Sequence, residues 1–337
     1  MMAACRPGDA VGRYRVLQIL GRGSFGVVLL AEDPLQAQRV AMKVVPCDHL
    51  DAAAADRARE AALAEAQLLQ RLRHPHVVSC LDVCWDAGRS VVWIALDYMN
   101  GGDLQSVIDS RRNSHEPPPD AGFVRRVLSA IGSALRFVHS QGVLHRDVKP
   151  SNVLLASSGT GAGSRPLSLV QAEIKLADFG ISKILEATAN ASTVVGTPPY
   201  MSPELVCGQP YGPAADAWAL GACLYELAAL RRPFEASNQL ALVRQIVDHE
   251  PAALPAGTAP DVAEAVQGLL RKDPRERLTL CDVIRIGSTA QLAGPPPGFP
   301  PPAAPAPAPL LRGPPTPRST PRDGAAGAGR PSQRRGG

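Results

Sequence analysis

The sequence contains no run of about twenty apolar residues, which is the length that a membrane-spanning helix requires. Its N-terminus has no apolar segment typical of a secretory signal, and Met2 in place of glycine excludes N-myristoylation. The seven cysteines are scattered without a C-x-x-C pair, a pattern typical of free thiols in a reducing compartment. We therefore expect a cytoplasmic protein with no membrane span.

Aromatic residues make up only 4% of the chain, and the net charge is a mild +4. Much of the positive charge lies in the last part of the chain, so it does not indicate nucleic-acid binding by the folded part. The hydrophobic content of 45% and charged content of 20% are typical of a globular protein. A length of 337 residues leaves room for one large domain and an appendage.

The motif that carries chemistry is H-R-D-V-K-P-S-N at 145–152, followed by D-F-G at 178–180. Phosphoryl transfer needs a carboxylate that receives the proton of the acceptor hydroxyl and oxygen ligands that hold Mg²⁺ on the nucleotide phosphates. Asp147 is the candidate base, while Asn152 and Asp178 are candidate ligands of Mg²⁺, for which Mn²⁺ is the substitute. An isolated H-R-D or D-F-G triplet occurs by chance, whereas the extended string is specific.

A glycine-rich segment, G-R-G-S-F-G-V-V at 21–28, lies between two apolar runs, 15–20 and 27–31, that predict strands. Glycine is needed there because a Cβ atom would keep the backbone from closing over phosphate oxygens. A lone G-x-G-x-x-G also occurs in plain turns and in dinucleotide-binding folds, but here a strand follows rather than a helix. The next predicted strand, 40–43, ends on Lys43, a candidate phosphate anchor.

With these motifs in order, the chain from about 14 to 285 resembles a eukaryotic serine/threonine protein kinase domain and is most similar to the NIMA-related kinases. Further support comes from G-G-D-L at 101–104, V-G-T-P-P-Y-M-S-P-E at 195–204 and R-P-F-E-A-S-N at 232–238. The resemblance implies a kinase that transfers the γ-phosphate of ATP to serine or threonine hydroxyls of protein substrates.

The resemblance implies the α+β, bilobal fold of protein kinases. A small, strand-rich N-lobe is expected at about 14–98 and a larger helical C-lobe at about 99–285. Residues 1–13 would be an N-terminal extension. The stretch 286–337 is rich in proline, alanine, glycine and arginine, so we expect a disordered tail.

Apolar residues at helical spacing predict one long helix in the N-lobe, at 51–73, and helices at 123–140 and 214–230 in the C-lobe. On the N-lobe helix, Glu65 is the acid that the resemblance pairs with Lys43. The alternative is a surface glutamate among others.

The resemblance also assigns the remaining site residues. Lys149 and Thr197 are the serine/threonine-kinase choices beside Asp147, and Leu96 is the gatekeeper behind the adenine. Asp103 reaches the ribose or caps the following helix. Asp216 anchors the catalytic loop, and Arg277 pairs with Glu204. The other nucleotide contacts are Leu20, Gly21, Gly23, Ser24, Phe25 and Gly26 in the glycine-rich loop, and Val28, Ala41, Asp97, Met99 and Leu154 around the adenine.

Regulation by phosphorylation is expected in the activation segment. Arg146 precedes Asp147 directly, and a phosphate brings close to two negative charges with which such an arginine can pair. Thr193 and Ser192 are the candidate sites, with Thr193 preferred by its spacing to the G-T-P at 196–198. The alternative to an active kinase is a pseudokinase-like scaffold that binds nucleotide and partners without catalysis, although such proteins usually lack Lys43, Asp147 or Asp178.

Three features of the chain carry weaker expectations. The glycine- and serine-rich insertion within 157–172 is a surface loop or a docking site. The P-x-x-P spacing at 314–317 fits an SH3 or WW domain, or is part of an unstructured terminus. The family resemblance suggests association with the cytoskeleton, centrosomes or cilia.

Overall fold

The computed structural model describes the greater part of the protein kinase-like region. The chain divides into two units, 1–295 and 296–337, and the second lies outside the described residues. The described residues are 6–23, 26–46, 59–60, 63, 66–86, 88, 90–157, 168–178 and 197–289.

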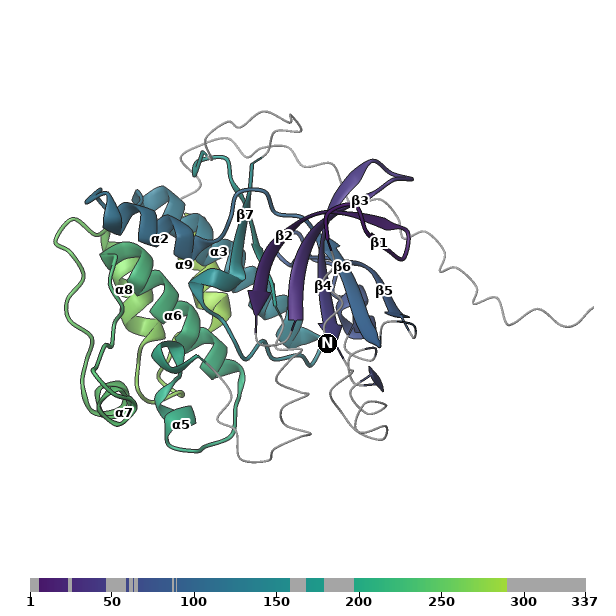
Figure 1. Ribbon diagram of the computed structural model, residues 1–337. Helices are drawn as coiled ribbons and strands as arrows, with labels where there is room; N and C mark the ends of the chain where they lie inside the picture. Colours follow the sequence, from purple (N-terminus) through teal and green to yellow (C-terminus); the bar gives the residue numbers. More distant parts are fainter. Residues whose placement is uncertain are drawn as a thin grey trace, which may run out of the picture. The chain divides into compact units, whose positions relative to one another are not determined.

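The first half of the described chain forms a six-stranded antiparallel sheet with the strand order β1-β2-β3-β4-β6-β5 (Figure 1). The runs at 15–20 and 27–31 lie in strands as predicted, and the continuous apolar run at 91–96 forms a strand whose residues 92–95 are buried. The strands are β1 (Ala10–Val11), β2 (Tyr14–Gly23), β3 (Gly26–Asp33), β4 (Gln38–Pro46), β5 (Cys80–Asp86) and β6 (Val91–Asp97).

One face of this sheet closes over its own apolar cluster. Tyr14 and Trp93 meet edge to face, with ring centroids 5.7 Å apart. Gly12, with φ of +58°, lies against the Trp93 ring, where a Cβ atom would come within 2.5 Å of an indole carbon. This contact holds β1 on the sheet, within the stretch that the sequence assigned to an N-terminal extension.

The long helix expected at 51–73 lies mostly outside the described residues. Of its length, 59, 60, 63 and 66–71 are helical. Leu69 and Leu72 are buried in the core, as its apolar stripe predicts. The helix ends two residues earlier than expected, which accords with the proline at position 75 and the backbone bond from Arg73 to Arg71.

The second half of the described chain is helical. The helices predicted at 123–140 and 214–230 are present within one or two residues of the expected bounds. The helices are α2 (Leu104–Asn113), α3 (Ala121–Ser140), α5 (Pro203–Val206), α6 (Pro213–Ala229), α7 (Gln239–Asp248), α8 (Pro260–Leu269) and α9 (Leu280–Thr289). A hairpin of β7 (Val153–Ala156) and β8 (Glu173–Leu176) and two short 3-10 turns, Pro150–Asn152 and Pro198–Tyr200, complete the described elements.

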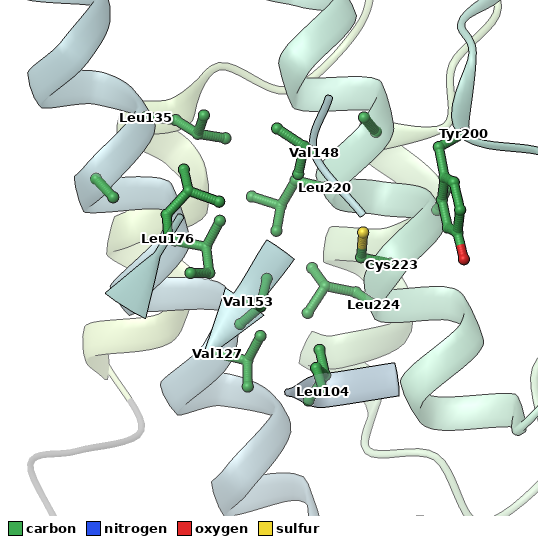
Figure 2. Close-up of a cluster of buried hydrophobic side chains, with 14 of the residues drawn as sticks. Leu104, Val127, Leu135, Val148, Val153, Leu176, Tyr200, Leu220, Cys223 and Leu224 are labelled. Carbon is green, nitrogen blue, oxygen red and sulfur yellow. The ribbon is translucent and has the colours of Figure 1, made fainter. Parts of the chain in front are cut away.

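The main core surrounds α6, which is apolar on nearly every side and therefore buried. Figure 2 shows part of this core, with Leu220 of α6, Val127 of α3 and Leu176 of β8. Val148, between the catalytic motif's Asp147 and Lys149, belongs to the same cluster. The loop that carries the candidate base is therefore packed against the main hydrophobic core. Within the described residues, no helix has the length and apolarity for a membrane crossing.

Candidate active site

Asp216, near the start of α6, binds the backbone of the catalytic loop. This carboxylate is fully buried and accepts the backbone N–H groups of His145 at 2.9 Å and Arg146 at 3.0 Å. His139 and Tyr211 donate to the same carboxylate at 2.7 and 2.5 Å. Burial alone would raise the pKa of Asp216, but these donors outweigh it and lower the pKa. Asp216 is therefore a fixed anion under the loop, as expected.

His145 organises the interior of the same loop. Its ring is fully buried, accepts the Asp147 N–H on Nδ1 at 3.2 Å and contacts the Ala177 carbonyl through Nε2 at 3.0 Å. Burial lowers the pKa of His145, against the opposing charge of Asp216. A neutral ring with its proton on Nε2 satisfies both contacts. His145 thereby links the loop that bears Asp147 to the strand end that precedes Asp178.

The Asp147 carboxylate has a partner on each oxygen. Thr197 donates its hydroxyl to Oδ1 at 2.9 Å, and Lys149 donates its ammonium to Oδ2 at 2.7 Å. Lys149 also reaches the Thr197 hydroxyl at 3.3 Å. The side chain amide of Asn152 donates to the Asp147 carbonyl at 2.8 Å. These contacts bring together the predicted base, lysine and threonine and leave the carboxylate in one orientation.

The candidate metal ligands Asn152 and Asp178 fit Mg²⁺ by their chemistry. Mg²⁺ in proteins keeps several waters and takes one or two side-chain oxygens plus substrate phosphates. Asn152 uses its nitrogen for the loop contacts, so its oxygen is available, and the Asp178 side chain is 44% exposed. Asp178 has φ of +58°, a left-handed backbone that is costly for a non-glycine residue and is found at functional sites. Within the described residues, no cluster of three histidine, cysteine or acidic side chains forms an alternative site.

Lys43 points from β4 to Asp178. Its ammonium donates to Asp178 Oδ1 at 2.7 Å, and its side chain is 14% exposed. Glu65, the partner that the resemblance gives to Lys43, lies outside the described residues. In this structure the candidate phosphate anchor and the candidate metal ligand therefore form an ion pair between the two lobes.

The described residues of the glycine-rich segment lie in β2 and β3, with Gly23 opposite Gly26. Gly26 has φ of +137°, and a Cβ atom there would lie 2.0 Å from the Val44 carbonyl oxygen, so only glycine fits. Gly21 has open space on its Cβ side. Leu20 precedes the loop and is 41% exposed.

Several residues that the resemblance places around the adenine have small or medium apolar side chains. Leu96 and Leu154 pack against a buried cluster that includes Met99 and Ala177. Strand register places Ala41 opposite Leu96. Val28 lies opposite Lys43 on the neighbouring pair of strands.

Asp103 caps helix α2. Its carboxylate accepts from the backbone N–H of Ser106 at 2.7 Å and from the Ser106 hydroxyl at 2.8 Å. Of the two roles that the sequence left open, the helix cap is present in the structure.

Two buried acid groups brace the region that follows Thr197. Glu204 forms a two-pronged pair with Arg277 at 2.8 and 3.0 Å, as predicted. Glu226 accepts from the Tyr200 hydroxyl at 2.6 Å and from Arg112 at 3.3 Å. Both pairs lie in the scaffold rather than at the reacting atoms.

Sequence reasoning did not identify several residues that shape this site. His139 and Tyr211 contact Asp216 from outside the motifs, and the Tyr200–Glu226 contact carries no sequence signal. Of the predicted site residues, Ser24, Phe25, Glu65, Ser192 and Thr193 lie outside the described residues.

Comparison with known proteins gives the same assignment for most of the chain. A family model described as "Protein kinase domain" matches residues 14–286. The chain is 32% identical over 273 residues to serine/threonine-protein kinase Nek4 of Mus musculus, covering 81% of this chain and 32% of that protein. It is 36% identical over 274 residues to serine/threonine-protein kinase Nek8 of Danio rerio, covering 81% and 36%.

A third relative, serine/threonine-protein kinase 36 of Pongo abelii, is 36% identical over 273 residues, with 81% of this chain and 19% of the relative covered. The chain thus spans about a third or less of the length of these relatives. The matched region contains the catalytic loop, the glycine-rich hairpin and the Asp216 anchor. This chain belongs to the protein kinase domain family.

Proposed function

We propose that the protein is a serine/threonine kinase that transfers the γ-phosphate of ATP to protein hydroxyls. The observation that carries this proposal is the arrangement around Asp147, where Lys149 and Thr197 each hold one carboxylate oxygen. A base orients an attacking hydroxyl only if its own orientation is fixed. The relatives named above as serine/threonine-protein kinases support the same acceptor class.

Each contact in the site corresponds to a step in the proposed reaction. Asp147 accepts the proton of the acceptor hydroxyl and orients its oxygen toward the γ-phosphorus. Lys149 is positioned to neutralise charge that develops on the γ-phosphate oxygens, and its contact with Thr197 keeps it there. The glycine-rich hairpin covers the phosphates and excludes water. Lys43 exchanges Asp178 for the α- and β-phosphates when nucleotide enters.

Asn152 and Asp178 would hold Mg²⁺, which when bound neutralises phosphate charge and orients the β- and γ-phosphates. The ligands would be the Asp178 carboxylate, whose side chain is 44% exposed, and the side-chain oxygen of Asn152. The Lys43–Asp178 pair keeps Asp178 from being an isolated anion before the nucleotide binds. When nucleotide enters, Lys43 changes its partner from Asp178 to the phosphates, and this change completes the active site.

Activation by phosphorylation at Thr193, with Ser192 as the second candidate, is part of the proposal. Arg146 lies next to the base, has φ of +68°, and is fastened to Asp216 through its backbone. A phosphothreonine that pairs with its guanidinium would tie the activation segment to the catalytic loop. A Thr193→Ala protein should then have lower activity than the parent. Equal activity of the two proteins would exclude this site.

Two further proposals concern the rest of the chain. The tail beyond residue 286 would act as an unstructured arm whose P-x-x-P spacing at 314–317 binds SH3 or WW domains. Loss of capture by an SH3 or WW array after Pro314→Ala and Pro317→Ala substitution would support this. The chain is similar to Nek4 and Nek8, which are named as members of the NIMA-related group. On this similarity we propose a cytoskeletal or centrosomal site of action for the protein.

The proposed function is tested by incubating the full chain with γ-labelled ATP, Mg²⁺ and an arrayed serine, threonine and tyrosine peptide library. We expect label on serine or threonine peptides and none on tyrosine peptides. Label on tyrosine alone would contradict the assigned acceptor class. Nucleotide binding without label transfer, before and after activation by an upstream kinase, would favour the scaffold that the sequence left as the alternative.

A further inference from the structure

The carboxylate of Asp97 joins three segments of the chain at the end of the nucleotide cleft. Asp97 is the last residue of β6 and the first of the hinge, the segment 97–99 that the kinase resemblance places along the adenine edge. Its Oδ2 accepts from the Lys175 ammonium on β8 at 2.8 Å and from the backbone N–H of Ser79 at 3.1 Å. The Asp97 N–H donates in turn to the Ser79 carbonyl at 3.1 Å. The Asp97 carboxylate therefore connects the hinge, Ser79 and strand β8.

The Lys175–Asp97 pair is largely removed from water. The two side chains are 14% and 19% exposed, and Lys175 has a second, more exposed partner in Glu173 at 3.2 Å. Burial opposes the charge of Lys175, but the hydrogen bonds and charges of Asp97 and Glu173 outweigh it and raise its pKa. A pair in this environment is screened less by salt than a surface pair and constrains its two segments more strongly.

Backbone bonds tie the hinge region to the β7–β8 hairpin on either side of this pair. On one side, Val78 donates to the Leu176 carbonyl and Leu176 donates to the His76 carbonyl, both at 2.9 Å. On the other, Gly101 donates to the Leu155 carbonyl at 2.8 Å. Strand β8 then continues within two residues to Asp178, the candidate metal ligand. Lys175 thus lies on the strand that leads from the adenine side of the cleft to its phosphate side.

We propose that Lys175 is a positioning residue for the nucleotide: it holds the Asp97 carboxylate against β8 and fixes the hinge backbone relative to the strand that leads to Asp178. The inference rests on the proposed function, because it assumes that ATP binds with its base at the hinge. Loss of Lys175 would free the hinge to shift against β8. It would also leave the largely buried Asp97 carboxylate without its cationic partner.

The test compares the full-length parent with Lys175→Met, Lys175→Arg, Asp97→Asn and the Lys175→Met/Asp97→Asn double variant. Adenosine and ADP affinities are measured by calorimetry, and KM for ATP and kcat by phosphate transfer. For Lys175→Met we expect a roughly fivefold to twentyfold weaker adenosine affinity and a similar rise in KM. We expect kcat within about threefold of the parent and substantial rescue by Lys175→Arg. In the double variant the losses should be less than additive.

A matched control is the Arg125–Asp261 pair between α3 and α8. It has distances of 2.6 and 2.7 Å and side chains 24% and 33% exposed, and none of its contacts is with the cleft residues. Arg125→Met should lower the melting temperature and leave adenosine affinity unchanged. All affinities are taken well below each variant's melting temperature.

Equal adenosine and ADP affinities for the parent and Lys175→Met would overturn the inference while leaving the proposed function intact. A fall in kcat with unchanged KM and affinities would also overturn it, because a positioning residue for the nucleotide acts on binding. Absence of nucleotide binding by the folded parent would overturn both the inference and the proposed function.

Discussion

Replacement of Asp216 by asparagine is the sharpest test of how the catalytic loop is held. Asparagine keeps the shape of the side chain but offers one acceptor oxygen where aspartate offers two. Asp216 Oδ2 now accepts from His139 and the His145 N–H, while Oδ1 accepts from Tyr211 and the Arg146 N–H. A histidine ring or a hydroxyl can change its role to accept from the new amide, but a backbone N–H cannot. In either amide orientation, one backbone donor of the catalytic loop therefore loses its acceptor.

The expected cost follows from that unpaired donor. A buried group without its partner costs about 1–3 kcal/mol, and the remaining bonds lose the strength that the charge gives them. We therefore expect the free energy of unfolding to fall by about 3 kcal/mol in urea titrations. Since Asp147 directly follows the two residues that Asp216 holds, a shift of about 1 Å in the loop should lower kcat on the order of a hundredfold at saturating ATP.

The matched control is Asp261→Asn, which weakens a partly exposed pair with Arg125. It should cost about 1 kcal/mol or less and leave kcat unchanged. A folded Asp216→Asn protein that keeps kcat within about twofold of the parent would show that Asp216 does not hold the catalytic loop. Equal losses of kcat in Asp216→Asn and Asp261→Asn would show the same.

Three further predictions follow from packing and charge. Gly26→Ala would place a methyl group 2.0 Å from the Val44 carbonyl oxygen, so KM for ATP should rise severalfold in steady-state kinetics, whereas Gly257→Ala, with open space, should have no effect. Arg277→Ala leaves Glu204 buried without its partner and should lower unfolding free energy by about 3–5 kcal/mol in urea; a loss below about 1 kcal/mol would contradict this. Burial, aided by the charges of His76 and Arg136, lowers the pKa of His74 from 6.5 to about 4. The unfolded chain therefore takes up the proton first as pH falls, and stability declines between about pH 6.5 and 4. His74→Asn should remove up to about 1.4 kcal/mol per pH unit of that slope in unfolding titrations; an unchanged slope would disprove the assignment.

The motifs of the site could be predicted because their chemistry requires fixed local spacing. Asp147, Lys149 and Asn152 lie within one turn-rich loop, and the structure brings this triplet together with Thr197 as the resemblance implied. The strands around the glycine-rich loop could be predicted because a short apolar run lies on either side of the glycines, and such runs bounded by turn residues favour strands.

Contacts between distant segments could not be predicted from local pattern. No sequence pattern singles out Lys175. Its pairing with Asp97, 78 residues away, depends on β8 lying against the hinge. The partners of Asp216 show the same limit: its anchoring role was expected, but nothing near His139 or Tyr211 indicates that both reach it. Strand β1 was missed because two residues give no period, and its place depends on the Gly12–Trp93 contact.

The central claim is that Asp147 acts as the base of phosphate transfer to a hydroxyl. The most direct measurement is the single-turnover rate of phosphate transfer to a serine or threonine peptide by the parent and by Asp147→Asn, with ATP affinity measured alongside. We expect a rate lower by roughly 10²–10⁴ in the variant, the range of general-base contributions, with ATP affinity little changed. A variant that transfers phosphate at close to the parent rate would contradict the claim.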